Sequence, residues 1–160
     1  MAYVVVQHTS PKHKTLLGTL LQRVTALPVH TADSGRVVEA NTIYVMPTSG
    51  TLTVVRGCLH FIATPQAASA PLVIDAFLTS LAQDQGCRAV GVVLSGMGRD
   101  GASGLLKMRH AGARTIGQNE KTCVVYGMPR VAYELGAVEH QLPLTSIGEE
   151  ILKLTAARKE

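Results

Sequence analysis

The second half of the chain alternates between strand-like and helix-like segments, and this alternation restricts the possible folds more than any other feature. From residue 73 onward, short apolar runs are separated by segments whose apolar residues recur at helical spacing. Repeated β–α units predict a parallel sheet with right-handed crossovers and helices on both faces. Helices are expected at 73–85, 101–111, 127–135 and 145–157, and strands at 88–95, 113–118 and 137–142.

The first part of the chain predicts one more β–α unit. Residues 2–7 form a β-branched run, and the following helix should start with Ser10 as N-cap and Pro11 in its first turn. This helix should run to about Ala26, and a second strand should begin at Leu27. We expect one apolar stripe of the helix to face the sheet, made by Leu16, Leu17, Leu20, Leu21 and Val24.

Short β runs at 42–46, 52–55 and 59–62 predict an antiparallel excursion, with Arg56-Gly57 as a tight hairpin turn. The segment from Thr64 to Pro71 is rich in Ala, Pro and Ser and predicts a loop that could border an active site. The predicted class is therefore α/β, with a doubly wound, mainly parallel sheet, helices on both faces and a β-hairpin excursion. We expect a single domain over residues 1–160.

Composition excludes several classes of function. The formal charge is +4, but the basic residues are scattered among only two Phe and four Tyr, so no nucleic-acid binding is expected, and an acidic protein partner suits the charge. The chain has no apolar run of about 20 residues and no signal-peptide pattern, which predicts no membrane insertion. Three cysteines without a Cys-x-x-Cys pair favour a reducing, cytoplasmic location. Cys58-x-His60 is too short for a zinc site, and no metal is expected.

Two candidate catalytic residues each follow a buried strand-like run. His8 follows residues 2–7 and Asp100 follows 88–95, so both should lie at the carboxyl edge of a sheet, where α/β enzymes gather their chemistry. A histidine there can act as a general base, and an aspartate can orient it. Alternatively, Asp100 is a helix N-cap and His8 an ordinary strand-end residue, with His13 as the second candidate for the base.

Two further residues could contact a substrate. Glycines on both sides of Met97 would free its backbone to present an amide to a developing oxyanion, or they only shape a tight turn. Arg130 follows a second such turn and could hold a substrate carboxylate or cap a neighbouring helix.

A dinucleotide-binding motif competes for the same loop. Gly96-x-Gly98-x-x-Gly101 follows a strand and opens a helix, and Glu120 comes roughly 20 residues later, as in the dinucleotide-binding fingerprint. However, a carboxylate at Asp100 would compete with a pyrophosphate for the amides of this helix start.

Several segments together resemble one known family. They are Gln7-His8, residues 92–101 (VVLSGMGRDG), 111–120 (AGARTIGQNE) and 123–130 (CVVYGMPR). They resemble the catalytic domain of the chemotaxis protein-glutamate methylesterases, CheB. Residues 10–17 (SPKHKTLL) and 80–86 (SLAQDQG) look most like the form fused to a CheR receptor methyltransferase.

The resemblance implies hydrolysis of glutamate methyl esters on chemoreceptors and, in many members, deamidation of receptor glutamines. It implies that His8 is similar to the family's catalytic histidine, Asp100 to its aspartate and Met97 to the residue whose amide helps form the oxyanion hole. No cofactor is implied, and the partner would be the cytoplasmic part of a methyl-accepting chemotaxis receptor.

The family's nucleophilic serine lies in a Gly-x-Ser-x-Gly-Gly turn ahead of this histidine, and the sequence contains no such turn. We therefore expect the chain to lack the first strand and nucleophile and to be inactive, or nearly so, as written. The alternative is a non-catalytic, receptor-binding remnant of the family. A lost strand would also expose sheet edges, which favours a homo-oligomer. The serines that lack the setting of a nucleophile elbow are Ser10, Ser34, Ser49, Ser95 and Ser103.

Overall fold

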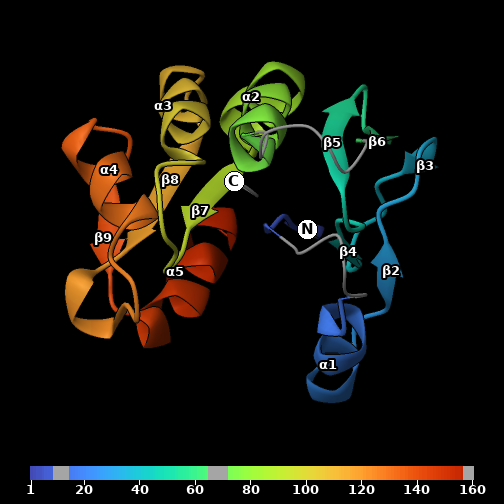
Figure 1. Ribbon diagram of the computed structural model, residues 1–160, viewed down its shortest axis with the longest axis horizontal. Coiled ribbons are helices and arrows are strands. Elements are labelled where there is room, and N and C mark those ends of the chain that lie inside the picture. The colour runs from blue at the N-terminus through green and yellow to red at the C-terminus, as the bar shows by residue number, and fades with distance from the viewer. Residues whose placement is uncertain (9–14, 65–71, 157–160) are drawn as a thin grey trace. The chain divides into compact units, whose positions relative to one another are not determined.

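The computed structural model describes residues 1–8, 15–64 and 72–156, and these fall into two compact units, Met1–Phe77 and Leu78–Glu160. Each unit is described by itself (Figure 1). The predicted helix start at Ser10 and Pro11, and residues 65–71 of the predicted loop, lie outside the described residues.

The first unit contains a three-stranded parallel sheet in the order β1 (Tyr3–Val5), β4 (Ile43–Val45), β2 (Val29–Thr31). The central strand carries Tyr44, which is fully buried. Its hydroxyl accepts a hydrogen bond from the backbone N–H of Glu39 at 2.9 Å. The buried ring therefore keeps its polar atom satisfied, as a core tyrosine requires.

Helix α1 (Leu17–Val24) connects β1 to β2 and ends close to the predicted position. The prediction that one stripe faces the sheet is wrong for three of its five members, because Leu16, Leu20 and Val24 are 68%, 53% and 81% exposed. Leu17 and Leu21 are half-buried. A step of one residue turns the helix by about 100°, so these two rows point in different directions and only one row can pack on the sheet.

The antiparallel excursion forms a second sheet of the first unit, in the order β3 (Arg36–Val37), β6 (Cys58–Ala63), β5 (Gly50–Val55). Arg56 and Gly57 both have positive φ, 51° and 72°, which matches the right-handed twist of a two-residue hairpin. The hairpin prediction is confirmed. The short strand β3 (Arg36–Val37) was not predicted, because two residues carry no readable alternation.

The second unit contains the regular β–α alternation. Its parallel sheet has the order β7 (Val90–Val93), β8 (Arg114–Gln118), β9 (His140–Leu142). Helices α3 (Ala102–His110) and α4 (Met128–Glu134) pack on each other and on β7 and β8. Helix α5 (Leu144–Ala156) packs on β8 from the other side of the sheet (Figure 1). The predicted parallel arrangement with helices on both faces is confirmed.

Helix α2 (Val73–Gln85) and the short 3-10 helix η1 (Gly86–Arg88) lead into this sheet. A glycine lets α3 approach the sheet closely, because a Cβ added to Gly91 would lie 2.6 Å from Cδ1 of Leu105. Among the described residues, none of the helices has the length and apolar character needed to cross a bilayer.

An ion pair joins the start of β8 to the start of β9. Nε of Arg114 donates to Oε2 of Glu139 at 2.7 Å, and Nη2 of Arg114 lies 2.9 Å from Nε2 of His140. Burial alone would raise the pKa of Glu139, but the hydrogen bond and the positive charge of Arg114 outweigh it and hold that pKa below the ordinary 4.5.

This lowered pKa predicts a pH-dependent contribution to stability. The ion pair stabilises the fold above the ordinary carboxyl pKa, and the stabilisation is lost as pH falls through the lowered pKa. Glu139→Gln should therefore lower the unfolding free energy at neutral pH and flatten its decline in acid, measured by urea unfolding at several pH values. Glu149→Gln, which removes an exposed helical pair with Lys153, is the control and should have little effect. Matching profiles for the two variants would refute the prediction.

Candidate active site

The candidate catalytic aspartate lies in the loop that joins β7 to α3. Gly98 and Gly101 turn this loop with φ values of 94° and 92°. Gly101 occupies the N-cap position of α3. Asp100 precedes the cap and is only 4% exposed. A buried carboxylate needs polar or charged neighbours, and this environment suits an acid that orients a histidine.

A second segment, which follows β8, lies beside this loop. It passes through the 3-10 helix η2 (Glu120–Thr122) and returns so that Gly96 and Tyr126 form a parallel bridge. The N–H of Gly96 donates to the carbonyl of Val125 at 3.0 Å, and the N–H of Met128 donates to the carbonyl of Gly96 at 2.8 Å. The loop is thus hydrogen-bonded to the start of α4.

The buried amide of Gln118 reinforces this junction. Its Oε1 accepts from the N–H of Ser95 at 2.8 Å, and its Nε2 donates to the carbonyl of Thr122 at 2.8 Å. Gln118 is 2% exposed. The hydroxyl of Ser95 in turn accepts from the N–H of Val125 at 3.0 Å. Sequence reasoning missed Gln118, although a polar residue at the end of an apolar strand was the available signal.

Two ionisable groups of the second segment remain protonated at neutral pH. Burial raises the pKa of the Cys123 thiol, which its hydrogen bond with Ser95 only partly offsets. Burial likewise raises the pKa of Tyr126, against a hydrogen bond from Gln141. Because a thiol attacks as the thiolate, Cys123 is not poised as a nucleophile.

Met97 and Arg130 lie close to this junction. A Cβ added to Gly127, the N-cap of α4, would lie 3.2 Å from Cα of Met97, so the Met97 backbone adjoins the start of that helix. Arg130 is exposed in the first turn of the helix and directly follows Pro129, so this turn leads into a helix as predicted. The second unit therefore gathers Met97, Asp100 and Arg130 on one loop and the helix beside it.

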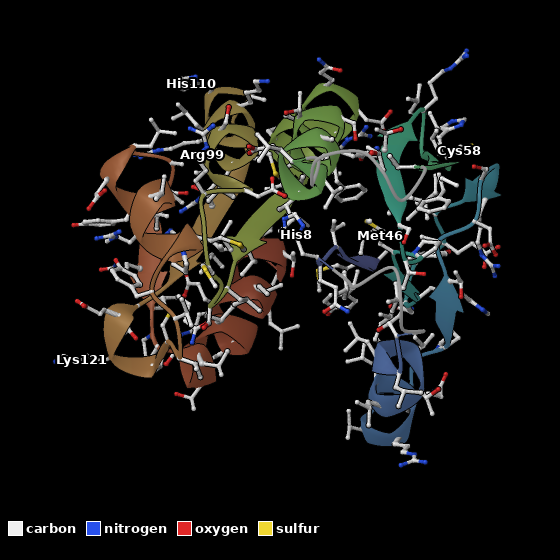
Figure 2. The ribbon with its side chains drawn as sticks, in the orientation of Figure 1. His8, Met46, Cys58, Arg99, His110 and Lys121 are labelled. Atoms are coloured by element: carbon white, nitrogen blue, oxygen red, sulfur yellow. The ribbon has the colours of Figure 1, made fainter. Side chains whose placement is uncertain are left out.

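His8 belongs to the first unit, where it is exposed beyond β1 (Figure 2). The strand ends at Val5, earlier than the predicted 2–7, so His8 follows it by three residues. Asp100 belongs to the second unit, and its pairing with His8 stays a prediction.

A nucleophile elbow sets a strained serine between a strand and a helix, and Ser34, Ser49 and Ser95 differ from it. Ser34 and Ser95 use their hydroxyls to bond the backbone of Phe61 and Val125. Ser49 has a positive φ of 61°, but it leads into strand β5 rather than into a helix. Within the described ranges, these three serines do not have the elbow geometry.

The family model for CheB methylesterase matches residues 1–151. The chain belongs to the CheB methylesterase family. The resemblance seen in the sequence motifs is therefore confirmed, and the match extends across both units.

Curated relatives carry the same family name. A protein-glutamate methylesterase/protein-glutamine glutaminase 1 of Rhizobium johnstonii is 53% identical over 98% of this chain, which covers 46% of that protein. A protein of the same name from Caulobacter vibrioides is 45% identical, with the same coverage of each chain. The chain thus spans about half the length of the curated relatives it matches.

A solved structure supports the fold. The CheB methylesterase catalytic domain of Thermotoga maritima superposes with a TM-score of 0.81 at 30% sequence identity. The match covers 94% of this chain and 82% of that domain. The α/β fold predicted from the sequence is that of a CheB catalytic domain.

Replacing Gln118 tests the junction between the two segments. Gln118→Ala should leave the N–H of Ser95 and the carbonyl of Thr122 without their partner, at a cost of about 1–3 kcal/mol in unfolding free energy. Urea unfolding monitored by circular dichroism measures this cost. Gln83→Ala, at an exposed position of α2, is the control and should stay within about 0.5 kcal/mol of the parent. Equal stability of the two variants would rule out a structural role for the Gln118 amide.

Replacing Gly127 tests the close approach of the two segments. A Cβ at this position would lie 2.7 Å from the carbonyl oxygen of Gly96, a backbone atom that cannot move without shifting the loop. Gly127→Ala should therefore be destabilising by thermal unfolding. Gly148→Ala in α5 is the matched control, because its Cβ would meet open space, and it should stabilise the helix by up to about 1 kcal/mol. A neutral Gly127→Ala would show that the approach is not tight.

Proposed function

We propose that this chain carries the acid–base part of a protein-glutamate methylesterase site, within one methylesterase-type domain over residues 1–160. In the proposal His8 is the general base, Asp100 orients it and the backbone N–H of Met97 helps to stabilise the oxyanion. Arg130 holds a carboxylate of the substrate. The observation that carries this proposal is the buried Asp100 on a hydrogen-bonded loop of a CheB-family domain.

The substrate in this proposal is a chemoreceptor methylated on glutamate, with glutamine deamidation as a second reaction of the same site. The names of the relatives, which join methylesterase and glutaminase, support both reactions. A chemoreceptor acts from the membrane on cytoplasmic partners, so we also infer a cytoplasmic location. We also propose that the chain is of the type that is fused to a CheR methyltransferase.

Ser34, Ser49 and Ser95 do not have the geometry of the missing nucleophile. We infer that turnover by the chain as written is at or near background, because a triad without its nucleophile keeps only the residual effect of binding and oxyanion contacts. A non-catalytic receptor-binding role is therefore the second candidate. The dinucleotide alternative is weakened by the carboxylate of Asp100, which directly precedes the Gly101 cap of α3, where a pyrophosphate would bind.

We also propose that the chain forms a homo-oligomer through the unpaired edge of a sheet. Within the described residues, β1 pairs only with β4 and β7 pairs only with β8. Each strand therefore presents an edge that another strand can pair with.

Methanol release tests the catalytic proposal. The chain alone should release no methanol above buffer from a methylated receptor fragment. When a relative's segment that bears Gly-x-Ser-x-Gly-Gly is fused to the N-terminus of this chain, the fusion protein should release methanol. His8→Ala or Asp100→Asn in the fusion protein should reduce the rate about a thousandfold or more. His110→Ala, an exposed histidine of α3, is the control and should retain the rate. Failure of the joined protein to release methanol would reject the catalytic proposal.

A further inference from the structure

Four exposed apolar side chains project from the two hydrogen-bonded segments of the second unit. Leu94, Met97, Val124 and Val125 are 44%, 83%, 94% and 42% exposed, and we call this set the apolar rim. Single exposed apolar residues are ordinary on protein surfaces. Four of them on two hydrogen-bonded segments offer apolar surface to another molecule.

The backbone under the rim is fixed by hydrogen bonds. The N–H of Cys123 donates to the carbonyl of Glu120 at 3.1 Å, and the N–H of Val125 donates to the hydroxyl of Ser95 at 3.0 Å. Val124, the most exposed member, lies between these two anchored residues. A surface that is already ordered loses less conformational entropy on binding, so the rim is suited to recognition.

The charges around the rim select an acidic partner. Residues 94–101 and 119–130 carry three exposed cations, and Figure 2 labels two of them, Arg99 and Lys121. The third is Arg130, whereas Glu120 is the one exposed carboxylate on these segments because Asp100 is buried. This excess of positive charge complements a segment that presents carboxylates.

We propose that the apolar rim docks the polypeptide segment that carries the methylated glutamate, with apolar side chains against the rim and neighbouring carboxylates toward the cations. The inference rests on the proposed function and deepens it, since it names the surface that selects the substrate. Met97 links the two, because its side chain belongs to the rim and its backbone N–H is the proposed oxyanion donor. A segment seated on the rim places its ester carbonyl beside that N–H.

A binding experiment tests the rim separately from the chemistry. The probe is a fluorescein-labelled synthetic peptide of alanine, leucine and glutamate with one central glutamate γ-methyl ester, and its anisotropy is followed during titration with the 160-residue chain. Val124→Ser should weaken binding at least about fivefold. Leu135→Ser, which changes a 48% exposed leucine at the far end of α4, should stay within about twofold. A peptide with lysine in place of the flanking glutamates should bind more weakly, and added salt should weaken the binding of the acidic peptide.

A second measurement does not depend on any variant. Binding of the peptide to the unaltered chain should shift the amide resonances of residues 94–97 and 123–126 in a two-dimensional NMR spectrum. The inference is overturned if these resonances do not move, if no saturable binding occurs, or if Val124→Ser and Leu135→Ser bind equally well. It is also overturned if sedimentation shows that Val124→Ser dissociates a dimer while peptide binding does not change. The rim would then contact a second copy of the chain.

Methanol measured with the nucleophile-bearing protein separates the two proposals. Peptide binding that depends on Val124, without methanol release, would reject the esterase proposal and retain the rim as an acidic-peptide site. Methanol release that is unchanged by Val124→Ser, at peptide concentrations well below saturation, would reject the rim and retain the esterase.

Discussion

The close contact between Gly96 and Gly127 is the constraint on which the candidate site depends. A Cβ at Gly127 would lie 2.7 Å from the carbonyl oxygen of Gly96, and that same oxygen accepts the N–H of Met128 at 2.8 Å. The loop after β7 and the start of α4 can therefore meet backbone to backbone. Gln118 completes the junction from the strand between them, where its amide bonds the N–H of Ser95. Because these groups are buried or paired, the junction holds its geometry without bound substrate.

This rigidity gives the three candidate residues of the second unit different environments on one short loop and helix. Asp100 is buried, whereas Met97 and Arg130 are exposed. A buried carboxylate is suited to stabilise a histidine that gains charge during proton transfer, and an exposed methionine and an exposed guanidinium are suited to contact a substrate. The fold thus buries Asp100, the proposed orienting acid, and leaves Met97 and Arg130, the proposed substrate contacts, exposed on the same loop and helix.

Periodicity predicted most of this fold because it reports directly on burial. The alternation after residue 73 gave α3 and α4 to within a residue at each end, and the Arg56-Gly57 turn followed from the backbone twist that a hairpin needs. Periodicity failed where it could not tell which of two neighbouring rows of a helix packs, as for Leu20 and Leu17 in α1. The polar residue Gln118 at the end of an apolar strand was a readable signal, but its hydrogen-bond partners could not be predicted, because they lie on segments that meet only in the folded structure.

The motif around Met97 and Asp100 could be predicted, but its apolar rim could not, for a physical reason. An exposed valine looks the same in the sequence as a buried one, and the run Cys123-Val124-Val125 resembles a strand. Only the hydrogen bonds of Val125 to Ser95 and Gly96 show that this run lies along a loop and leaves Val124 in solvent. Exposed apolar surface held in a fixed shape is costly in water unless a partner covers it for part of the time. In the proposal above this partner is the substrate polypeptide, and the rim lies on the two segments that are hydrogen-bonded to each other.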